Sequence, residues 1–206
     1  TIPSSITEIG KGAFNECKKL EKFTILPCEE KRIEYFEDKF LVSKSESSKT
    51  NYDILVWVKP TQDIMIIPSF IEKIGNYAFY KFSSLTQITI PSSVTSIGDF
   101  VLYECSSLTQ ITFEIPSSVT SIGLAAFLGC SSLTKITIPS SVTKIGISAF
   151  YECSSLTQIT ISSSVTEIGN YAFSKCSKLT QITIPSSATS IGNNVFSGCS
   201  SLTQIT

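Results

Sequence analysis

Residues 83–98 read SSLTQITIPSSVTSIG, and close copies of this segment recur along the chain. The glycine that ends each copy marks the period: Gly75, Gly98, Gly123, Gly146, Gly169 and Gly192. Successive glycines are 23, 25, 23, 23 and 23 residues apart. The longer step has two extra residues, because 111–116 reads ITFEIP where other copies read ITIP. Such a period is typical of solenoids, in which each repeat forms one coil.

Each copy contains two extended segments. In Leu108–Phe113 the last three residues alternate apolar, polar and apolar, which is the period of a strand with one buried face. In most copies a proline follows, as at Pro91, and proline cannot donate to a strand ladder. A second short strand, such as Val94–Ile97, leads to the column glycine, which we expect to adopt a positive φ at this corner.

One or two helical turns are predicted after each column glycine. Ala126, Phe127 and Cys130 have the i, i+1, i+4 spacing of an inward helix face. One repeat cannot form a core alone, since its apolar burial is smaller than the entropy cost of ordering it. Coils stacked about 4.8 Å apart can pair their strands. The predicted fold is therefore an α/β solenoid of 23-residue coils with parallel strand ladders and short helices on the convex side.

The shared columns give the pattern C-x-x-L-x-x-I-x-I-P-x-x-V-x-x-I-G-x-x-A-F. It resembles the BspA-like, treponemal-type leucine-rich repeat found in bacterial adhesins and in surface-protein families of anaerobic protists. The recurring SSLTQ is most similar to the protist members. The resemblance covers residues 1–27 and 67–206. It implies one coil in which a β-hairpin replaces the helix, exposure at a cell surface or secretion, and binding to host or matrix proteins.

We expect one leucine-rich repeat solenoid over the whole chain. Its predicted parts are a first repeat at 1–27, a β-hairpin insert at 28–66 and regular repeats at 67–206. The insert differs in composition, because 24 of the 33 charged residues lie in the first 82 positions.

The predicted hairpin strands are Tyr35–Val42 and Tyr52–Val58, on either side of the polar run 43–51. Glu37 and Asp38 would point opposite ways on a strand, which favours a solvated face over an acid/base pair. Trp57 alternates with Leu55, which favours a core position over a ligand platform.

Composition excludes several classes of function. The net charge is −1, which lacks the basic footprint of a protein that binds nucleic acid. Histidine is absent, which removes Ser-His-Asp and Cys-His catalysis and histidine metal sites. No apolar run reaches the length of about 18 residues that a membrane span needs. We therefore expect no catalytic residues, no metal and no cofactor.

Six of the seven cysteines occupy one column of the repeat: Cys17, Cys105, Cys130, Cys153, Cys176 and Cys199. Phe82 fills the same column after Gly75, and a position shared by Cys and Phe is a core position. Buried free thiols are therefore favoured over disulfides or metal ligation. Cys28 lies outside the column and is the thiol expected to react first.

Two surfaces are candidates for a partner. The first comprises the insert and an apolar patch on three consecutive predicted helices: Tyr35, Lys39, Phe100, Tyr103, Leu124, Leu128, Ile147 and Tyr151. Its alternative is that these rings pack sideways on neighbouring helices. The second is a concave polar ladder: Gln87, Thr89, Gln110, Thr112, Lys135, Thr137, Gln158, Thr160, Gln181 and Thr183. Its alternatives are simple solubilisation of a sheet or ice binding, although glutamines and Lys135 interrupt the threonines.

The sequence thus predicts a non-enzymatic module for recognition or adhesion, whose partner is a host, matrix or structural protein that contacts the first surface before the ladder. The competing hypothesis is a cytoplasmic structural scaffold. We expect the chain to be a section of a longer protein, because it begins and stops inside a coil. End-to-end self-association through unpaired strand edges is a further expectation.

Overall fold

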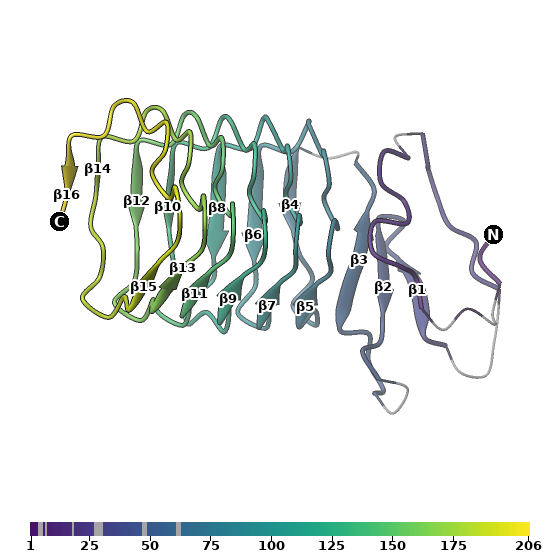
Figure 1. The fold of residues 1–206 in the computed structure, drawn as a ribbon. Helices are drawn as coiled ribbons and strands as arrows, with labels where there is room; N and C mark the ends of the chain where they lie inside the picture. The colour runs from purple at the N-terminus through teal and green to yellow at the C-terminus, as the bar shows by residue number, and fades with distance from the viewer. Residues whose placement is uncertain (4–5, 7, 18, 27–30, 47–48, 61–62) are drawn as a thin grey trace.

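The computed structural model describes residues 1–3, 6, 8–17, 19–26, 31–46, 49–60 and 63–206. It is a β-solenoid of about seven coils of about 23 residues, stacked along one axis (Figure 1). The two chain ends lie at opposite ends of the stack. The predicted parallel strand ladders are confirmed.

The longest sheet has nine strands and runs along one side of the solenoid. Its order is β1 (Ile33–Phe36), β2 (Phe40–Ser43), β3 (Ile54–Val58), β5 (Lys73–Ile74), β7 (Ser96–Ile97), β9 (Ser121–Ile122), β11 (Lys144–Ile145), β13 (Glu167–Ile168) and β15 (Ser190–Ile191). The strands from β3 to β15 pair in parallel. Ile145, for example, lies opposite Ile122 and Ile168, so identical columns stack on one another.

The strands that carry the polar ladder form three separate sheets, which we call the ladder face. They are β4 (Ile64–Ile66), β6 (Gln87–Ile90) and β8 (Gln110–Phe113); β10 (Lys135–Thr137) and β12 (Gln158–Thr160); and β14 (Gln181–Ile182) and β16 (Gln204–Ile205). Pairing is interrupted between β8 and β10 and again between β12 and β14.

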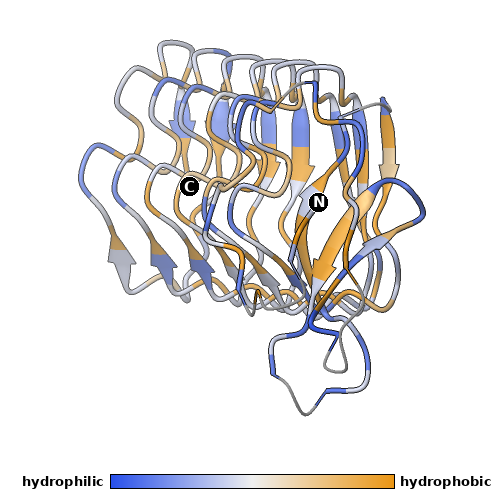
Figure 2. Ribbon diagram, turned by 90° about the vertical axis from the view of Figure 1, so that its right-hand side faces the viewer, coloured by the Kyte–Doolittle hydropathy of each residue, from blue (hydrophilic) through white to orange (hydrophobic). Residues whose placement is uncertain are grey.

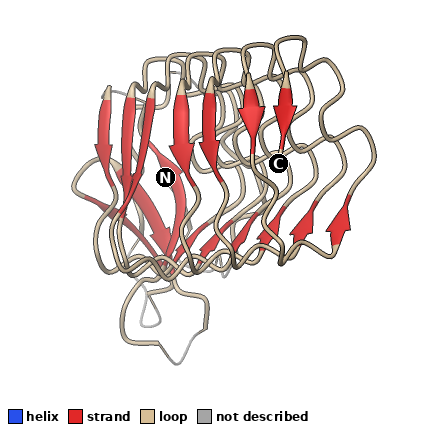
Figure 3. Cartoon of the chain, turned by 90° about the vertical axis from the view of Figure 1, so that its left-hand side faces the viewer, coloured by secondary structure: helices blue, strands red, loops and turns tan. Residues whose placement is uncertain are grey.

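The prediction of short helices was wrong: no helix occurs among the described residues (Figure 3). The segment after each column glycine is a series of turns, which we call the turn face. Its second and sixth residues have positive φ, for example Phe100 at 54° and Glu104 at 52°. Alternate N–H groups therefore point along the stack, and Phe100 N donates to Leu124 O at 2.8 Å. An α-helix would need those donors within its own segment.

The expected positive φ at the column glycines was also wrong. Among the described glycines, only Gly12, Gly129 and Gly198 have positive φ, and none of these is a column glycine. Glycine is needed instead because the preceding coil approaches closely. A Cβ added to Gly146 would lie 2.5 Å from Gly123 O, a separation that requires the backbone to shift.

The core of the regular coils is continuous from one coil to the next. Buried leucine, isoleucine, valine, phenylalanine and cysteine columns fill it, and the strands in Figure 2 carry orange apolar residues between hydrophilic turns. The rings of Phe127, Phe150 and Phe173 stack with centroids 5.1 and 5.5 Å apart. Each coil therefore completes the core of its neighbour, as expected for a solenoid.

The hairpin contains one more strand than predicted, and the insert also includes β4 of the ladder face. Tyr35–Val42 is divided into β1 and β2 by a turn in which Glu37 and Asp38 both have φ of 51°. These carboxylates therefore lie at a turn and not on a strand. The predicted antiparallel pairing across the polar run is confirmed, since β2 pairs with β3. β3 then pairs in parallel with β5 and joins the hairpin to the solenoid.

A second, smaller core lies on the other face of the hairpin. Phe23 packs edge-on against Phe14, Tyr35 and Trp57, with ring centroids 4.8 to 5.3 Å apart. Trp57 is buried in this cluster, which confirms the predicted core position. The hairpin is thus a layer between the N-terminal residues and the regular coils.

Candidate partner-binding surfaces

Two of the predicted patch residues on the turn face pack sideways on the neighbouring coil. Phe100 stacks on Tyr77 with ring centroids 4.9 Å apart, and Tyr103 stacks on Tyr80 at 5.0 Å. Both rings are half-buried. For these two residues the structure shows the alternative that the sequence left open, and the aromatic contacts stabilise the stack.

The patch continues into two coils where apolar side chains reach the solvent. Leu124 is 37 % exposed and Ile147 is 48 % exposed. Leu128 and Tyr151, one turn further along the same coils, are half-buried. The ammonium of Lys175 lies 4.9 Å from the centre of the Tyr151 ring. We call Leu124, Leu128, Ile147 and Tyr151 the apolar patch.

Leu124 and Ile147 replace hydrogen-bonding residues that the sequence analysis did not single out. The position after the column glycine is Asn76, Asp99, Asn170 or Asn193 in the other regular coils. We call it the Asx column. Asn76 Oδ1 accepts from Asp99 N at 3.2 Å, Asp99 Oδ1 from Leu124 N at 2.9 Å, and Asn170 Oδ1 from Asn193 N at 2.7 Å. The signal was present in the sequence as a polar column with two apolar exceptions.

The two candidate residues in the hairpin have partners within the chain. Tyr35 is half-buried, and its hydroxyl donates to Glu21 O at 3.2 Å. Burial and the nearby Asp38 carboxylate raise the pKa of this phenol. Lys39 lies 3.9 Å from a Glu37 carboxylate oxygen and 4.8 Å from the centre of the Phe40 ring. Their role in partner binding stays a prediction, and the structure does not bring them together with the apolar patch.

The ladder face presents nearly all of its predicted glutamine and threonine side chains to solvent, and Thr89 alone of the ten predicted residues is half-buried. A neighbouring threonine column has a structural role, because its hydroxyls donate to carbonyls of the preceding coil. Thr109 Oγ1 donates to Thr86 O and Thr157 Oγ1 to Thr134 O, both at 3.0 Å. The outer Gln and Thr columns remain available to a ligand.

A groove of about 1000 Å³ crosses the ladder face where β8 and β10 are not paired. We call it the seam groove. Side chains of β8, β10 and β12 line it, and the two-residue insertion lies at its edge. Ile115 of that insertion is 92 % exposed. Lys135 is the only charged residue in the lining.

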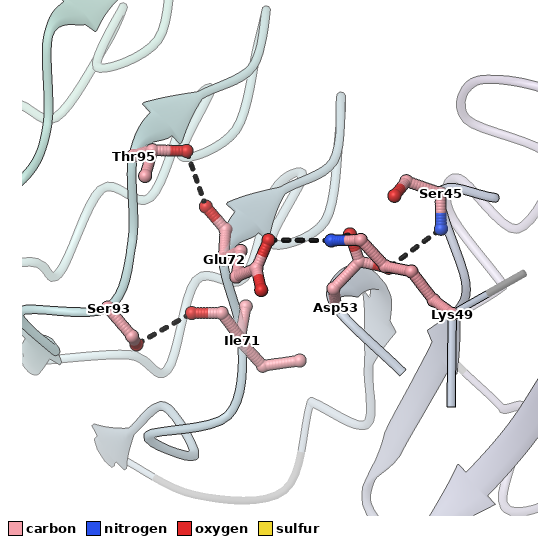
Figure 4. Close-up of polar contacts among 7 residues, drawn as sticks. All are labelled: Ser45, Lys49, Asp53, Ile71, Glu72, Ser93 and Thr95. Atoms are coloured by element: carbon pink, nitrogen blue, oxygen red, sulfur yellow. Dashed lines mark hydrogen bonds and ion pairs between the residues drawn. The ribbon is translucent and has the colours of Figure 1, made fainter. Parts of the chain in front are cut away.

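A charged cluster fixes the loop between β2 and β3 to the regular coils (Figure 4). Lys49 Nζ lies 2.7 Å from both Asp53 Oδ2 and Glu72 Oε2, and Ser45 N donates to Asp53 Oδ1 at 2.7 Å. Burial alone would raise the pKa of Asp53, but the hydrogen bonds from Lys49 and Ser45 outweigh it and hold the pKa below its usual value. The hydrogen bonds of Lys49 to Asp53 and Glu72 raise the pKa of its ammonium group. We call this cluster the clamp.

The five column cysteines from Cys105 to Cys199 are buried and free, as predicted. Each thiol donates to a carbonyl of the preceding coil, as Cys153 Sγ does to Phe127 O at 3.2 Å. Burial raises the pKa of Cys105 and Cys153 to about 12. Cys17 departs from its column and is exposed, because the hairpin separates its coil from the regular stack. The prediction about Cys28 lies outside the described residues.

Comparison with known families establishes to which protein family the chain belongs. The model for the BspA type leucine rich repeat region matches residues 1–51, 60–114 and 112–206 with six copies. The chain belongs to the BspA-type leucine-rich repeat family. Proteins built from these repeats are typically non-enzymatic, surface-associated and protein-binding. A comparison with curated proteins found no match.

Several solved BspA-like structures resemble the solenoid. A leucine-rich cell surface protein from Faecalibacterium prausnitzii is 30 % identical with a TM-score of 0.62, over 84 % of this chain and 54 % of its own. A leucine-rich repeat protein from Eubacterium ventriosum is 28 % identical with a TM-score of 0.74, over 98 % and 58 %. The Treponema pallidum leucine-rich repeat protein is 27 % identical with a TM-score of 0.52, over 74 % and 62 %.

The chain therefore spans between half and two thirds of the length of these BspA-like proteins. Within the part that the structure describes, no cluster of three or more His, Cys, Asp or Glu residues is arranged to hold a metal ion. The described residues also include no helix long and apolar enough to cross a membrane.

Proposed function

We propose that this BspA-type solenoid is a non-catalytic protein-recognition module displayed at a cell surface, with the apolar patch as its contact surface. Family membership and the similar cell surface protein from F. prausnitzii support the location. The partner class we propose is a matrix or host protein that presents an apolar surface.

The observation that carries the proposal is the pair of exceptions in the Asx column. An Asn or Asp here accepts a hydrogen bond from the next coil, as Asp99 does from Leu124 N. Leu124 and Ile147 cannot accept that bond, and they expose apolar surface instead. Adjacent exposed apolar residues on an otherwise polar array are the usual mark of an interaction surface.

The test restores the column. The double variant Leu124→Asn, Ile147→Asn should keep the free energy of unfolding within about 0.5 kcal/mol of the parent. Its binding to a panel of purified extracellular-matrix proteins, measured with the chain displayed on cells, should fall at least about ten-fold. The control variant Gln181→Ser on the ladder face should bind like the parent. Absence of binding to every member of the panel, or equal binding by the double variant, would refute the proposal.

A further inference from the structure

The seam groove exists because neighbouring coils separate on the ladder face. Thr109 N donates to Thr86 O and Thr157 N donates to Thr134 O, both at 2.9 Å. Residues 63–206 are all described, and among them Thr134 N makes no equivalent bond to Thr109 O. No strand pairing joins β8 to β10. The coils remain bonded on the other two faces, where Phe100 N meets Leu124 O and Ile97 pairs with Ile122.

The two-residue insertion accompanies this break. Glu114 N still donates to Ile90 O in the preceding coil at 3.0 Å. The chain continues through Ile115, and the regular repeat pattern begins again at Pro116. A second break, between β12 and β14, has no insertion. The seam groove therefore differs from the second break in its lining, which includes the exposed side chain of Ile115 and the charge of Lys135.

The charge in the seam groove is not compensated by the protein. Lys144 lies 3.0 Å from Glu167, and Lys175 lies 2.7 Å from Glu152. Among the described residues, Lys135 has no such acidic partner, and no acidic residue lines the groove. Glu114 is not part of the lining, and its carboxylate accepts a hydrogen bond from Ser92 N at 3.1 Å. The same column is glutamine in every other regular coil, at Gln87, Gln110, Gln158, Gln181 and Gln204.

The chemistry of the lining indicates the ligand. A lone ammonium among neutral hydroxyl and amide groups complements one carboxylate, and Ile115 offers an apolar contact beside it. Thr112, Thr137 and Thr160 supply donors and acceptors suited to peptide groups. Phe113, the only aromatic residue in the lining, is half-buried, so the groove lacks the exposed ring on which sugars stack.

We propose that the seam groove binds an extended segment of a partner protein that carries an acidic side chain next to an apolar one. The carboxylate pairs with Lys135, and the apolar side chain packs on Ile115. This site rests on the proposed recognition function, but it uses a different face from the apolar patch and adds charge selectivity to it.

The experiment selects a displayed library of random heptapeptides against the whole chain, with counter-selection on the Lys135→Gln variant. This substitution restores the glutamine of the other coils, so thermal unfolding should be unchanged. The expected result is enrichment of peptides that contain Asp or Glu beside an aliphatic residue. Their synthetic forms should bind Lys135→Gln about ten-fold more weakly by fluorescence anisotropy, and replacing the peptide carboxylate by its amide should produce the same, non-additive loss.

Two further variants keep the test decisive. Ile115→Ser and deletion of Glu114 and Ile115, which restores the 23-residue step, should both weaken peptide binding. Leu124→Asn, Ile147→Asn should not, so a failure of the apolar patch and a failure of the groove give different results. The proposal is overturned by an absence of enriched peptides, by enrichment without acidic residues, by equal binding to Lys135→Gln, or by binding only to an acidic oligosaccharide such as a chondroitin sulfate hexasaccharide.

Discussion

The regular coils and the hairpin region, by which we mean the hairpin and the described N-terminal residues before it, are stabilised by different kinds of contact. From residue 83 onward only nine of the 33 charged residues remain. Repeated positions there bond or stack on their own copies one coil away, except at the two breaks of the ladder face. The hairpin region pairs its strands antiparallel and has its own aromatic cluster. It is joined to the coils by the β3–β5 pairing and by the ion pair between Lys49 and Glu72. Repetition therefore makes the coils sensitive to any change in a shared column, whereas the hairpin region depends on unique contacts.

The largest expected difference between the two regions concerns glycine. Gly146→Ala would place a Cβ 2.5 Å from a backbone oxygen of the preceding coil, whereas a Cβ at Gly10 would meet nothing within 4 Å. We expect Gly146→Ala to reduce the free energy of unfolding by about 1–3 kcal/mol and Gly10→Ala to leave it nearly unchanged. Chemical denaturation of both variants measures this. Equal changes in the free energy of unfolding would show that the regular coils accommodate the added Cβ without loss of stability.

The next expected effect is a pH response confined to the hairpin. The pKa of Asp53 is lower in the folded protein than its ordinary value, so its stabilising effect is present above the unfolded carboxyl pKa of about 4. That effect is lost as the pH falls through the folded pKa. Hydrogen exchange should therefore rise in residues 44–46 and 49–53 at acidic pH before it rises in the regular coils.

Two variants sharpen this prediction about the clamp. Asp53→Asn should cost about 1–3 kcal/mol, because it leaves the Lys49 ammonium with a weaker acceptor at a buried position. Glu72→Gln, at an exposed carboxylate, should cost less than about 1 kcal/mol. If hydrogen exchange rises at the same pH in the regular coils and in the hairpin loop, the clamp does not stabilise the loop independently of the coils.

The smallest expected effect is on reactivity and not on stability. Burial raises the pKa of the column thiols above its ordinary value, so they remain protonated at neutral pH and lack the reactive thiolate. Titration with a disulfide reagent should label Cys17 rapidly, together with Cys28, the thiol that the sequence predicts to react first, and the five column thiols only after denaturation. Rapid labelling of five or more native thiols would contradict the buried column.

Sequence alone determined the solenoid, its period, the two strand columns and the buried thiols of the regular coils, because residues repeated at a fixed step occupy equivalent places in stacked coils. Cys17, on the far side of the hairpin, is the exception. It also placed Leu124 and Ile147 in a candidate apolar patch and Lys135 in the concave ladder, as an interruption of its threonines. The turn at Glu37 and Asp38 was missed, because glutamate is not a typical residue at positive φ and the apolar residues on either side of the pair were taken as one strand.

Tertiary structure alone decided the backbone conformation and the backbone hydrogen bonds of each repeat. The spacing of Ala126, Phe127 and Cys130 suits an inward helix face and an inward turn equally well, and only the carbonyls of the next coil draw alternate N–H groups along the stack. The role of the column glycine likewise depends on a neighbouring backbone that one repeat does not contain. The break between β8 and β10 arises in the same way, because pairing is a property of two coils and not of either one.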